Sequence, residues 1–269
     1  MKHFNLKNIS VKTKALTAIS ACIVALCSLP IANSMGDIKM PDDGNPPIKK
    51  PAIYLYSDDL PKMVNVRLDY FLLTKNTVPQ KYLNSWKVIA HKDGHLIDLQ
   101  PEKTNCDSLP TTFGFEYAQT ACKANNYPYI YWDGNKFIKE VPKKLLGWSI
   151  KKENIREFLN EKADEMAMNT AEKTEFVRFW SEIISNYPAT DFRIYFLQNE
   201  EVDDWIKLSV SPKPDSWNRI EVVITPIQPN TQSTPYTLKK IKRQGFTMVE
   251  WGGIIIDKNF NKKQRFFDR

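Results

Sequence analysis

The sequence predicts an α+β protein, built mainly of antiparallel β-sheets with a central pair of α-helices. Runs of β-branched and aromatic residues recur between residues 52 and 132 and again between residues 192 and 256. Two amphipathic segments with a helical period lie between these halves. This order lacks the regular strand–helix alternation of a parallel sheet, so the strands are expected to pair mainly with antiparallel neighbours.

The first half of the chain has the pattern of short strands separated by turns. Residues 86–90 and 95–99 flank Asp93-Gly94, and Asp-Gly between two apolar runs is a strong hairpin signal. Residues 101–126 show little periodicity and are expected to form an insertion loop. The strands predicted for this half are residues 52–56, 64–70, 86–90, 95–99 and 127–132.

The predicted helix pair occupies the middle of the chain. Apolar side chains recur near a period of 3.6 residues over 152–166 and over 169–185. Asn169 can cap the second helix, and Glu172, three residues later, supports its first turn as in a capping box. Further strands are expected at residues 192–197, 205–210, 219–225 and 246–256.

The first 34 residues have the pattern of an export signal. Four lysines and no acidic residue flank an apolar run from Ala15 to Ile31, and small residues lead to Ser34, after which a signal peptidase would cleave. The run is shorter than the roughly 20 residues that a membrane-spanning helix needs. The protein is therefore expected to be exported, either to the periplasm or out of the cell, with no transmembrane span after cleavage. A lipoprotein attached through Cys22 and an uncleaved anchor are the alternatives.

The rest of the chain divides by composition. Residues 35–49 are rich in proline, glycine and charge, and are expected to form a flexible linker. Residues 50–257 are expected to form one β-rich domain, or two packed subdomains at 50–147 and 148–257. The tail, residues 258–269, is basic and aromatic, and we interpret it as a frayed end rather than a surface-binding segment.

Charge and cysteine content narrow the classes of function. Loss of the four signal lysines lowers the net charge from +7 to +3, and no nucleic-acid-binding motif is found, so nucleic acid is not expected as a partner. Two cysteines remain after cleavage, Cys106 and Cys122, and an even pair in an exported protein predicts a disulfide. The sequence contains neither a metal-ligand motif nor a glycine-rich nucleotide loop, so no metal or other cofactor is expected.

Five segments carry a resemblance to a known family: Lys50–Tyr56, Trp86–Ala90, Tyr129–Asp133, Ser211–Asp215 and Gly245–Gly253. They resemble, in order, the motifs of an uncharacterised family found in bacteria and fungi, among them KPVIYLYP, YLFWE, SPKPD and GFTVVEWGG. The resemblance implies kinship over residues 50–253 and supplies no activity. Asp133 stands where the family has glutamate, which draws the carboxylate back by one methylene group.

Two carboxylates are candidate catalytic groups. Asp133 and Glu250 each lie at a predicted strand end beside a tryptophan, Trp132 and Trp251 respectively, with glycine close by. Two such carboxylates can divide the acid and base roles when one is desolvated and the other hydrated. The tryptophans could stack against sugar rings, as a glycan-directed hydrolase requires. The alternative interpretation is that both acids bind loop amides and both tryptophans fill the core.

The loop at residues 211–215 is a further candidate. Its prolines stiffen it, so Asp215 and Lys213 could contact a ligand, although a turn between strands explains the same pattern. The function we favour is an exported, non-catalytic binding or envelope-associated domain with a tryptophan–carboxylate cleft and a glycan or another envelope component as its partner. A glycan hydrolase that uses Asp133 and Glu250 is the alternative.

Overall fold

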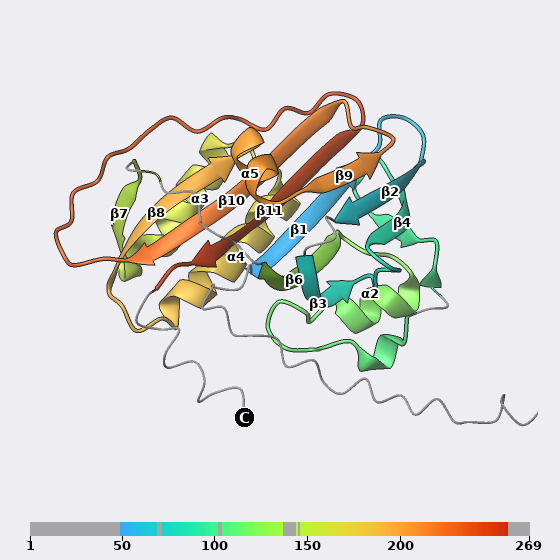
Figure 1. Ribbon diagram of the computed structural model, residues 1–269, viewed down its shortest axis with the longest axis horizontal. Helices are drawn as coiled ribbons and strands as arrows, with labels where there is room; N and C mark the ends of the chain where they lie inside the picture. The colour runs from blue at the N-terminus through green and yellow to red at the C-terminus, as the bar shows by residue number, and fades with distance from the viewer. Residues whose placement is uncertain (1–48, 69–71, 102–103, 137–143, 145, 258–269) are drawn as a thin grey trace, which may run out of the picture. The chain divides into compact units, whose positions relative to one another are not determined.

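The computed structural model describes residues 49–68, 72–101, 104–136, 144 and 146–257. The predicted signal peptide, the linker except for Lys49, and the basic tail lie outside these residues. Within the described part of the chain, eleven strands form two sheets and four α-helices flank them, which confirms the predicted α+β class (Figure 1).

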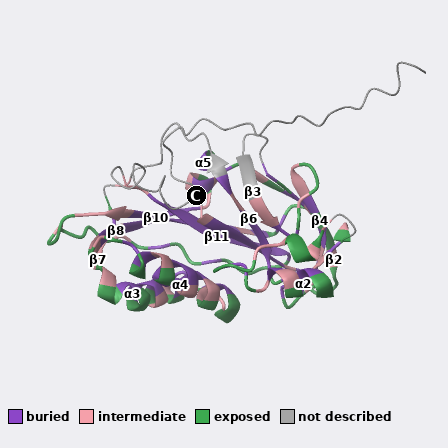
Figure 2. Ribbon diagram, turned by 90° about the horizontal axis from the view of Figure 1, so that it is seen from below, coloured by how far each residue is buried: buried purple, intermediate pink, exposed green. Residues whose placement is uncertain are grey.

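The larger sheet has seven strands in the order β3-β6-β1-β11-β10-β8-β7. Neighbouring strands are antiparallel except β10 and β11, which are parallel. Because β11, β10 and β1 lie inside the sheet, most of their residues are buried, as Figure 2 shows for β10 and β11. The strands are β1 (Lys49–Tyr56), β3 (Leu72–Val78), β6 (Ile130–Lys136), β7 (Trp148–Lys151), β8 (Asp191–Gln198), β10 (Ser216–Pro226) and β11 (Thr247–Ile255).

The smaller sheet is fully antiparallel and has the order β5-β4-β2-β9. Its strands are β2 (Lys62–Leu68), β4 (Ser85–Ala90), β5 (Leu96–Asp98) and β9 (Leu208–Ser211). The predicted hairpin between β4 and β5 is confirmed. Gly94 has a φ of 91°, a left-handed conformation that glycine adopts without steric cost.

Two helices cover one face of the larger sheet, whereas α5 (Glu200–Trp205) lies on the other (Figures 1 and 2). These two are α3 (Ile155–Glu165) and α4 (Thr170–Ser185). The predicted capping box of α4 is present: the Asn169 side chain accepts a hydrogen bond from Glu172 N, and the Glu172 carboxylate accepts one from Asn169 N. No helix among the described residues is long and apolar enough to cross a membrane.

Two segments differ from their predicted structure. The strand expected at 205–210 is instead the end of α5, a short connection and β9, because acidic residues in the first turn of α5 suit the positive end of a helix. The expected loop at 101–126 contains the helix α2 (Ala118–Ala124). The predicted disulfide joins Cys106 to Cys122, with their Cα atoms 5.5 Å apart, and it ties α2 to the preceding loop.

Candidate ligand-binding site

Asp133 and Glu250, the predicted catalytic pair, extend from opposite faces of the larger sheet. Glu250 on β11 pairs with Ile53 on β1, and Ile53 pairs with Ile130 on β6. Residues opposite each other share a face, while side chains alternate along a strand. Asp133 is three positions from Ile130 and therefore points the other way. The two carboxylates do not line one cleft, which corrects the prediction.

The two tryptophans predicted to contact a ligand are core residues. Trp132 and Trp251 both have 0% of their surface exposed. The Trp251 ring packs edge-to-face against Phe176 of α4, with ring centroids 5.5 Å apart. A ring without exposed surface offers no face for a sugar, so the alternative interpretation of these tryptophans fits the structure.

Glu250 belongs to a buried ionic cluster. Arg219 on the neighbouring β10 donates from Nε to the Glu250 carboxylate at 2.5 Å, and both side chains have 0% exposure. Arg219 Nη1 donates to Asp203 at 2.8 Å and to the carbonyl of Ile206 at 2.5 Å. Burial alone would lower the pKa of Arg219, but the charges and hydrogen bonds of Glu250 and Asp203 together outweigh burial and raise it. These contacts hold α5 against the sheet.

A second buried carboxylate, Glu221, lies on the same face. Neither of its oxygens has a hydrogen-bond partner among the described residues. Burial raises the pKa of Glu221 well above its ordinary value, and the charge of Glu250 raises it further. Gly252 lies beside it, and a Cβ at that position would come 2.8 Å from Glu221 Oε1, so a larger residue would force this buried carboxylate to shift.

Asp133 holds an irregular stretch between two strands. Its Oδ1 accepts a hydrogen bond from Asn76 N at 2.7 Å, and its Oδ2 accepts from Asn76 Nδ2 and from the Tyr131 hydroxyl. The register between β3 and β6 shifts between Thr74 and Thr77, where Asn76 lies. The carboxylate therefore replaces the strand pairing that the irregularity interrupts.

The loop residues Asp215 and Lys213 lie apart from Asp133. Asp215 Oδ2 accepts a hydrogen bond from Phe246 N at 2.8 Å, which joins the loop before β10 to the start of β11. Gly245 has a φ of 58°, and a Cβ there would approach Asp215 Oδ2 within 2.3 Å. Lys213 is exposed. Asp215 therefore stabilises the contact between this loop and the start of β11.

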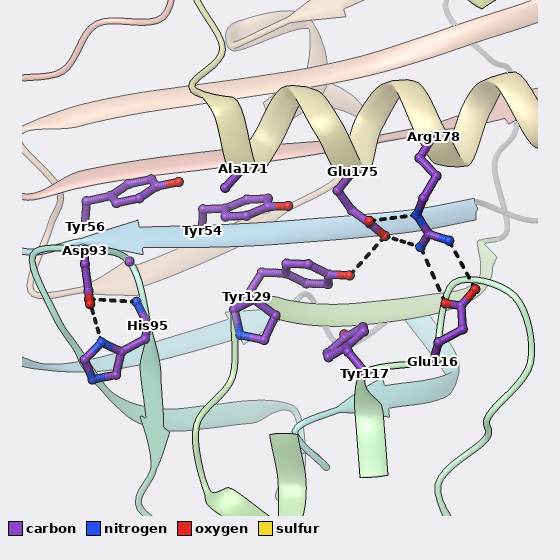
Figure 3. Close-up of a pocket in the computed structure, with 12 residues that line it drawn as sticks. Tyr54, Tyr56, Asp93, His95, Glu116, Tyr117, Tyr129, Ala171, Glu175 and Arg178 are labelled. Atoms are coloured by element: carbon purple, nitrogen blue, oxygen red, sulfur yellow. Dashed lines mark hydrogen bonds and ion pairs between the residues drawn. The ribbon is translucent and has the colours of Figure 1, made fainter. Parts of the chain in front are cut away.

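A cleft of about 590 Å³ lies on the helix-covered side of the sheet, and sequence reasoning did not find it (Figure 3). It is bounded by α4, by β1, by the β4–β5 hairpin and by the segments that lead into α2 and β6. Its lining combines tyrosine rings with a few charged side chains, as ligand sites commonly do. The lining residues are Tyr54, Tyr56, Asp93, Gly94, His95, Glu116, Tyr117, Pro128, Tyr129, Ala171, Glu175 and Arg178.

Four tyrosines form a continuous row along this cleft. Tyr54 and Tyr56 alternate on β1, so they share a face, and their rings are parallel within 6° at a centroid spacing of 6.4 Å. Tyr129 on the adjacent strand segment lies 5.1 Å from Tyr54, and Tyr117 lies 4.9 Å from Tyr129. Tyr56 and Tyr117 are half-buried, whereas Tyr54 and Tyr129, which lie between them in the row, are buried. The accessible rings are therefore at the two ends of the row.

An ionic network closes one end of the cleft. Glu175 of α4 accepts hydrogen bonds from Lys50, from Arg178 Nε and Nη2, and from the Tyr129 hydroxyl. Arg178 Nη1 also donates to Glu116 at 3.1 Å. Burial alone would raise the pKa of Glu175, but Arg178 and Lys50 outweigh burial and lower it. Glu175 is thus ionised and fixed in place by its partners.

The capping box of α4 extends into the row of tyrosines. The Tyr56 hydroxyl donates to Glu172 at 2.7 Å and accepts from Asn169 Nδ2 at 2.8 Å. Arg243 Nη2 donates to the other oxygen of Glu172 at 2.5 Å. Burial raises the pKa of Tyr56, and the charge of Glu172 raises it further, so the hydroxyl keeps its proton. The start of the helix therefore fixes the position of the Tyr56 ring.

The β4–β5 hairpin forms the opposite end of the cleft. Asp93 Oδ1 lies 2.5 Å from His95 Nδ1, and the His95 ring stacks on His91 with centroids 3.9 Å apart. Among the described residues, no group of three or more His, Cys, Asp or Glu side chains is arranged to hold a metal ion. The histidines rigidify the hairpin and place the exposed Asp93 at the mouth of the cleft.

The signal for this site was present in the sequence. Tyr54, Tyr56 and Tyr129 fall within two of the segments that carry the family resemblance, and tyrosines at alternating positions place hydroxyl-bearing rings on one face of a strand. The chain matches no protein-family model, no curated protein and no solved structure. The resemblance therefore stays a prediction, and function has to be argued from the geometry of the cleft.

Proposed function

We propose that this protein is an exported, non-catalytic binding protein whose tyrosine-lined cleft holds a short stretch of glycan. The observation that carries the proposal is the pair of half-buried rings, Tyr56 and Tyr117, at the two ends of a row of four tyrosines in a cleft of about 590 Å³. Aromatic faces pack against the apolar faces of sugar rings, while carboxylate, guanidinium and hydroxyl groups bind their hydroxyls.

The state of the charged groups favours binding over catalysis. Glu175 is held by Lys50 and Arg178, which keeps it ionised and unable to act as an acid at neutral pH. The hydrolase alternative required Asp133 and Glu250 on either side of one sugar bond, and these residues lie on opposite faces of the sheet. This arrangement does not suit the hydrolase alternative.

Export is supported by two independent features. The N-terminal 34 residues have the pattern of a signal peptide, and Cys106 and Cys122 are joined in a disulfide. Disulfides persist in oxidising compartments such as the periplasm and the exterior of the cell. An exported protein with an open aromatic cleft would meet glycans of the cell envelope or of the medium.

A glycan array followed by calorimetry tests the proposal on the chain that begins after Ser34. We expect Tyr117→Ala to weaken binding roughly tenfold, because a half-buried ring that contacts the sugar is lost. Ala171→Trp should abolish binding, because the exposed Ala171 lines the cleft and a large side chain there obstructs it without removing any core contact. The matched control is Tyr82→Ala, an exposed ring outside the cleft.

Melting curves of every variant separate loss of binding from loss of folding. The proposal is overturned if no glycan binds, or if glycan binding is unchanged in Ala171→Trp while that variant melts like the wild type.

A further inference from the structure

We infer that the cleft selects glycans that carry free amino groups, so that the ligand is cationic at neutral pH. This inference rests on the proposed function and adds the chemical class of the ligand. Three carboxylates line the cleft, those of Asp93, Glu116 and Glu175, against one cation, Arg178. The buried ammonium of Lys50 lies behind Glu175 and offsets part of this excess. The cleft therefore presents a net negative charge to its contents.

All three carboxylates are ionised at neutral pH. For Asp93, hydrogen bonds from the His95 backbone and ring outweigh its slight burial and lower its pKa. For Glu116, hydrogen bonds from its own backbone amide and from Arg178 outweigh burial and lower its pKa. Asp93 and Glu116 are also exposed, so an ammonium group of the ligand can reach them without displacing a buried contact.

The tyrosine rings reinforce this preference. The face of an aromatic ring attracts a cation through its quadrupole. The negative charge of the cleft also acts on the tyrosine hydroxyls. Burial raises the pKa of Tyr117 and of Tyr129, and the charge of Glu175 raises both further. The carboxylates at both ends of the cleft and the half-buried rings of Tyr56 and Tyr117 therefore favour a positively charged ligand.

A neighbouring groove has the opposite charge and serves as an internal comparison. It lies between α3 and α4, has a volume of about 550 Å³, and shares Arg178 with the cleft. Its other charged lining residues are Arg156, Lys173 and Asp164. An anionic ligand would favour this groove, whereas the cleft on the other side of Arg178 favours a cation.

The test compares two oligosaccharides that differ in one group: a glucosamine tetramer, with free amines, and the N-acetylglucosamine tetramer, without them. We expect the glucosamine tetramer to bind roughly tenfold more tightly at low salt, from exposed ion pairs and cation–π contacts. This preference should decline as salt is added, because exposed charges are screened. A uronate tetramer should bind most weakly.

Single neutralised carboxylates locate the effect. Asp93→Asn and Glu116→Gln should each lower the ratio of the two affinities roughly threefold, by removing one exposed ion pair. The matched control is Asp164→Asn, which removes the same charge from the neighbouring groove and should leave the ratio unchanged.

Equal binding of the two tetramers, tighter binding of the acetylated or acidic one, or an unchanged ratio in both cleft variants overturns the inference. In those cases the proposed function still stands if Ala171→Trp abolishes binding of the acetylated tetramer. If Ala171→Trp leaves every ligand bound, the proposed function itself fails.

Discussion

Replacing Arg219 with methionine should destabilise the protein strongly, because it removes the only cation that contacts the buried carboxylate of Glu250 within the described residues. Arg219 has no exposed surface and donates to Glu250, to Asp203 and to the carbonyl of Ile206. Methionine keeps an unbranched apolar side chain at this position but removes the guanidinium group. What remains is a buried carboxylate and a carbonyl without their donor, and removing one partner of a buried pair costs about 3–5 kcal/mol.

The size of the loss sets the assay. For a protein of about this size each kcal/mol lowers the melting temperature by about 2–4 °C, so Arg219→Met should melt about 6–20 °C below the wild type at neutral pH. Urea unfolding followed by tryptophan fluorescence gives the free energy directly, since Trp132, Trp180 and Trp251 are buried in the native state.

The control for this experiment is Lys239→Met, which removes an exposed ion pair with Glu200 and should not shift the melting temperature measurably. If the free energy of unfolding of Arg219→Met lies within about 1 kcal/mol of the wild-type value, the cluster is hydrated or open in solution, and the structural role assigned to Glu250 is refuted.

Three further predictions concern stability and processing. Because burial and the charge of Glu250 raise the pKa of Glu221 above its ordinary 4.5, the folded protein holds a proton that the unfolded chain releases. The stability this proton contributes is complete below pH 4.5 and is lost as the pH rises through the raised value, so Glu221→Gln should unfold at higher urea than the wild type at pH 8; equal midpoints across a pH series would contradict this. Replacing Cys106 and Cys122 with serine should lower the free energy of unfolding in urea by about 3 kcal/mol, because the disulfide joins residues 16 positions apart in the sequence. No difference from the wild type would argue against a formed bond. Mass spectrometry of the exported protein should show a chain that begins after Ser34, and an intact N-terminus would contradict the signal peptide.

The elements that the sequence predicted well are those with local causes. The second helix begins after Asn169 because its side chain and that of Glu172 satisfy backbone groups within three residues. The β4–β5 hairpin follows from Asp93-Gly94 for a similar reason. The helix α5 was missed because its six residues are too few to show a clear apolar period. Its position also depends on the contact between Asp203, which lies in α5, and Arg219, which lies in β10.

The candidate site was harder to predict, because its residues come from five separate segments. Glu250 looked like a catalytic acid from its neighbours in sequence, but its neighbour in space, Arg219, is 31 residues away and binds its carboxylate in the core. Tyr54 and Tyr129 have the pattern of ordinary core residues, and only the pairing of β1 with β6 places their rings 5.1 Å apart. Sequence periodicity gives the face of a strand, but it does not give the partner across that face.

Lys50, which binds the cleft residue Glu175, combines an unfavourable backbone conformation with a buried charge. Lys50 has a φ of 46°, a left-handed conformation that costs a residue with a Cβ about 1–2 kcal/mol. It lies where the pairing of β1 with β11 is interrupted by a bulge, and its buried ammonium binds Glu175 and the carbonyl of Gly114. An apolar residue in regular β-structure would avoid both the strain and the burial of a charge. The chain instead bears these costs at the position where Lys50 binds Glu175, a residue that lines the cleft, as would be expected if the cleft is the binding site that we propose.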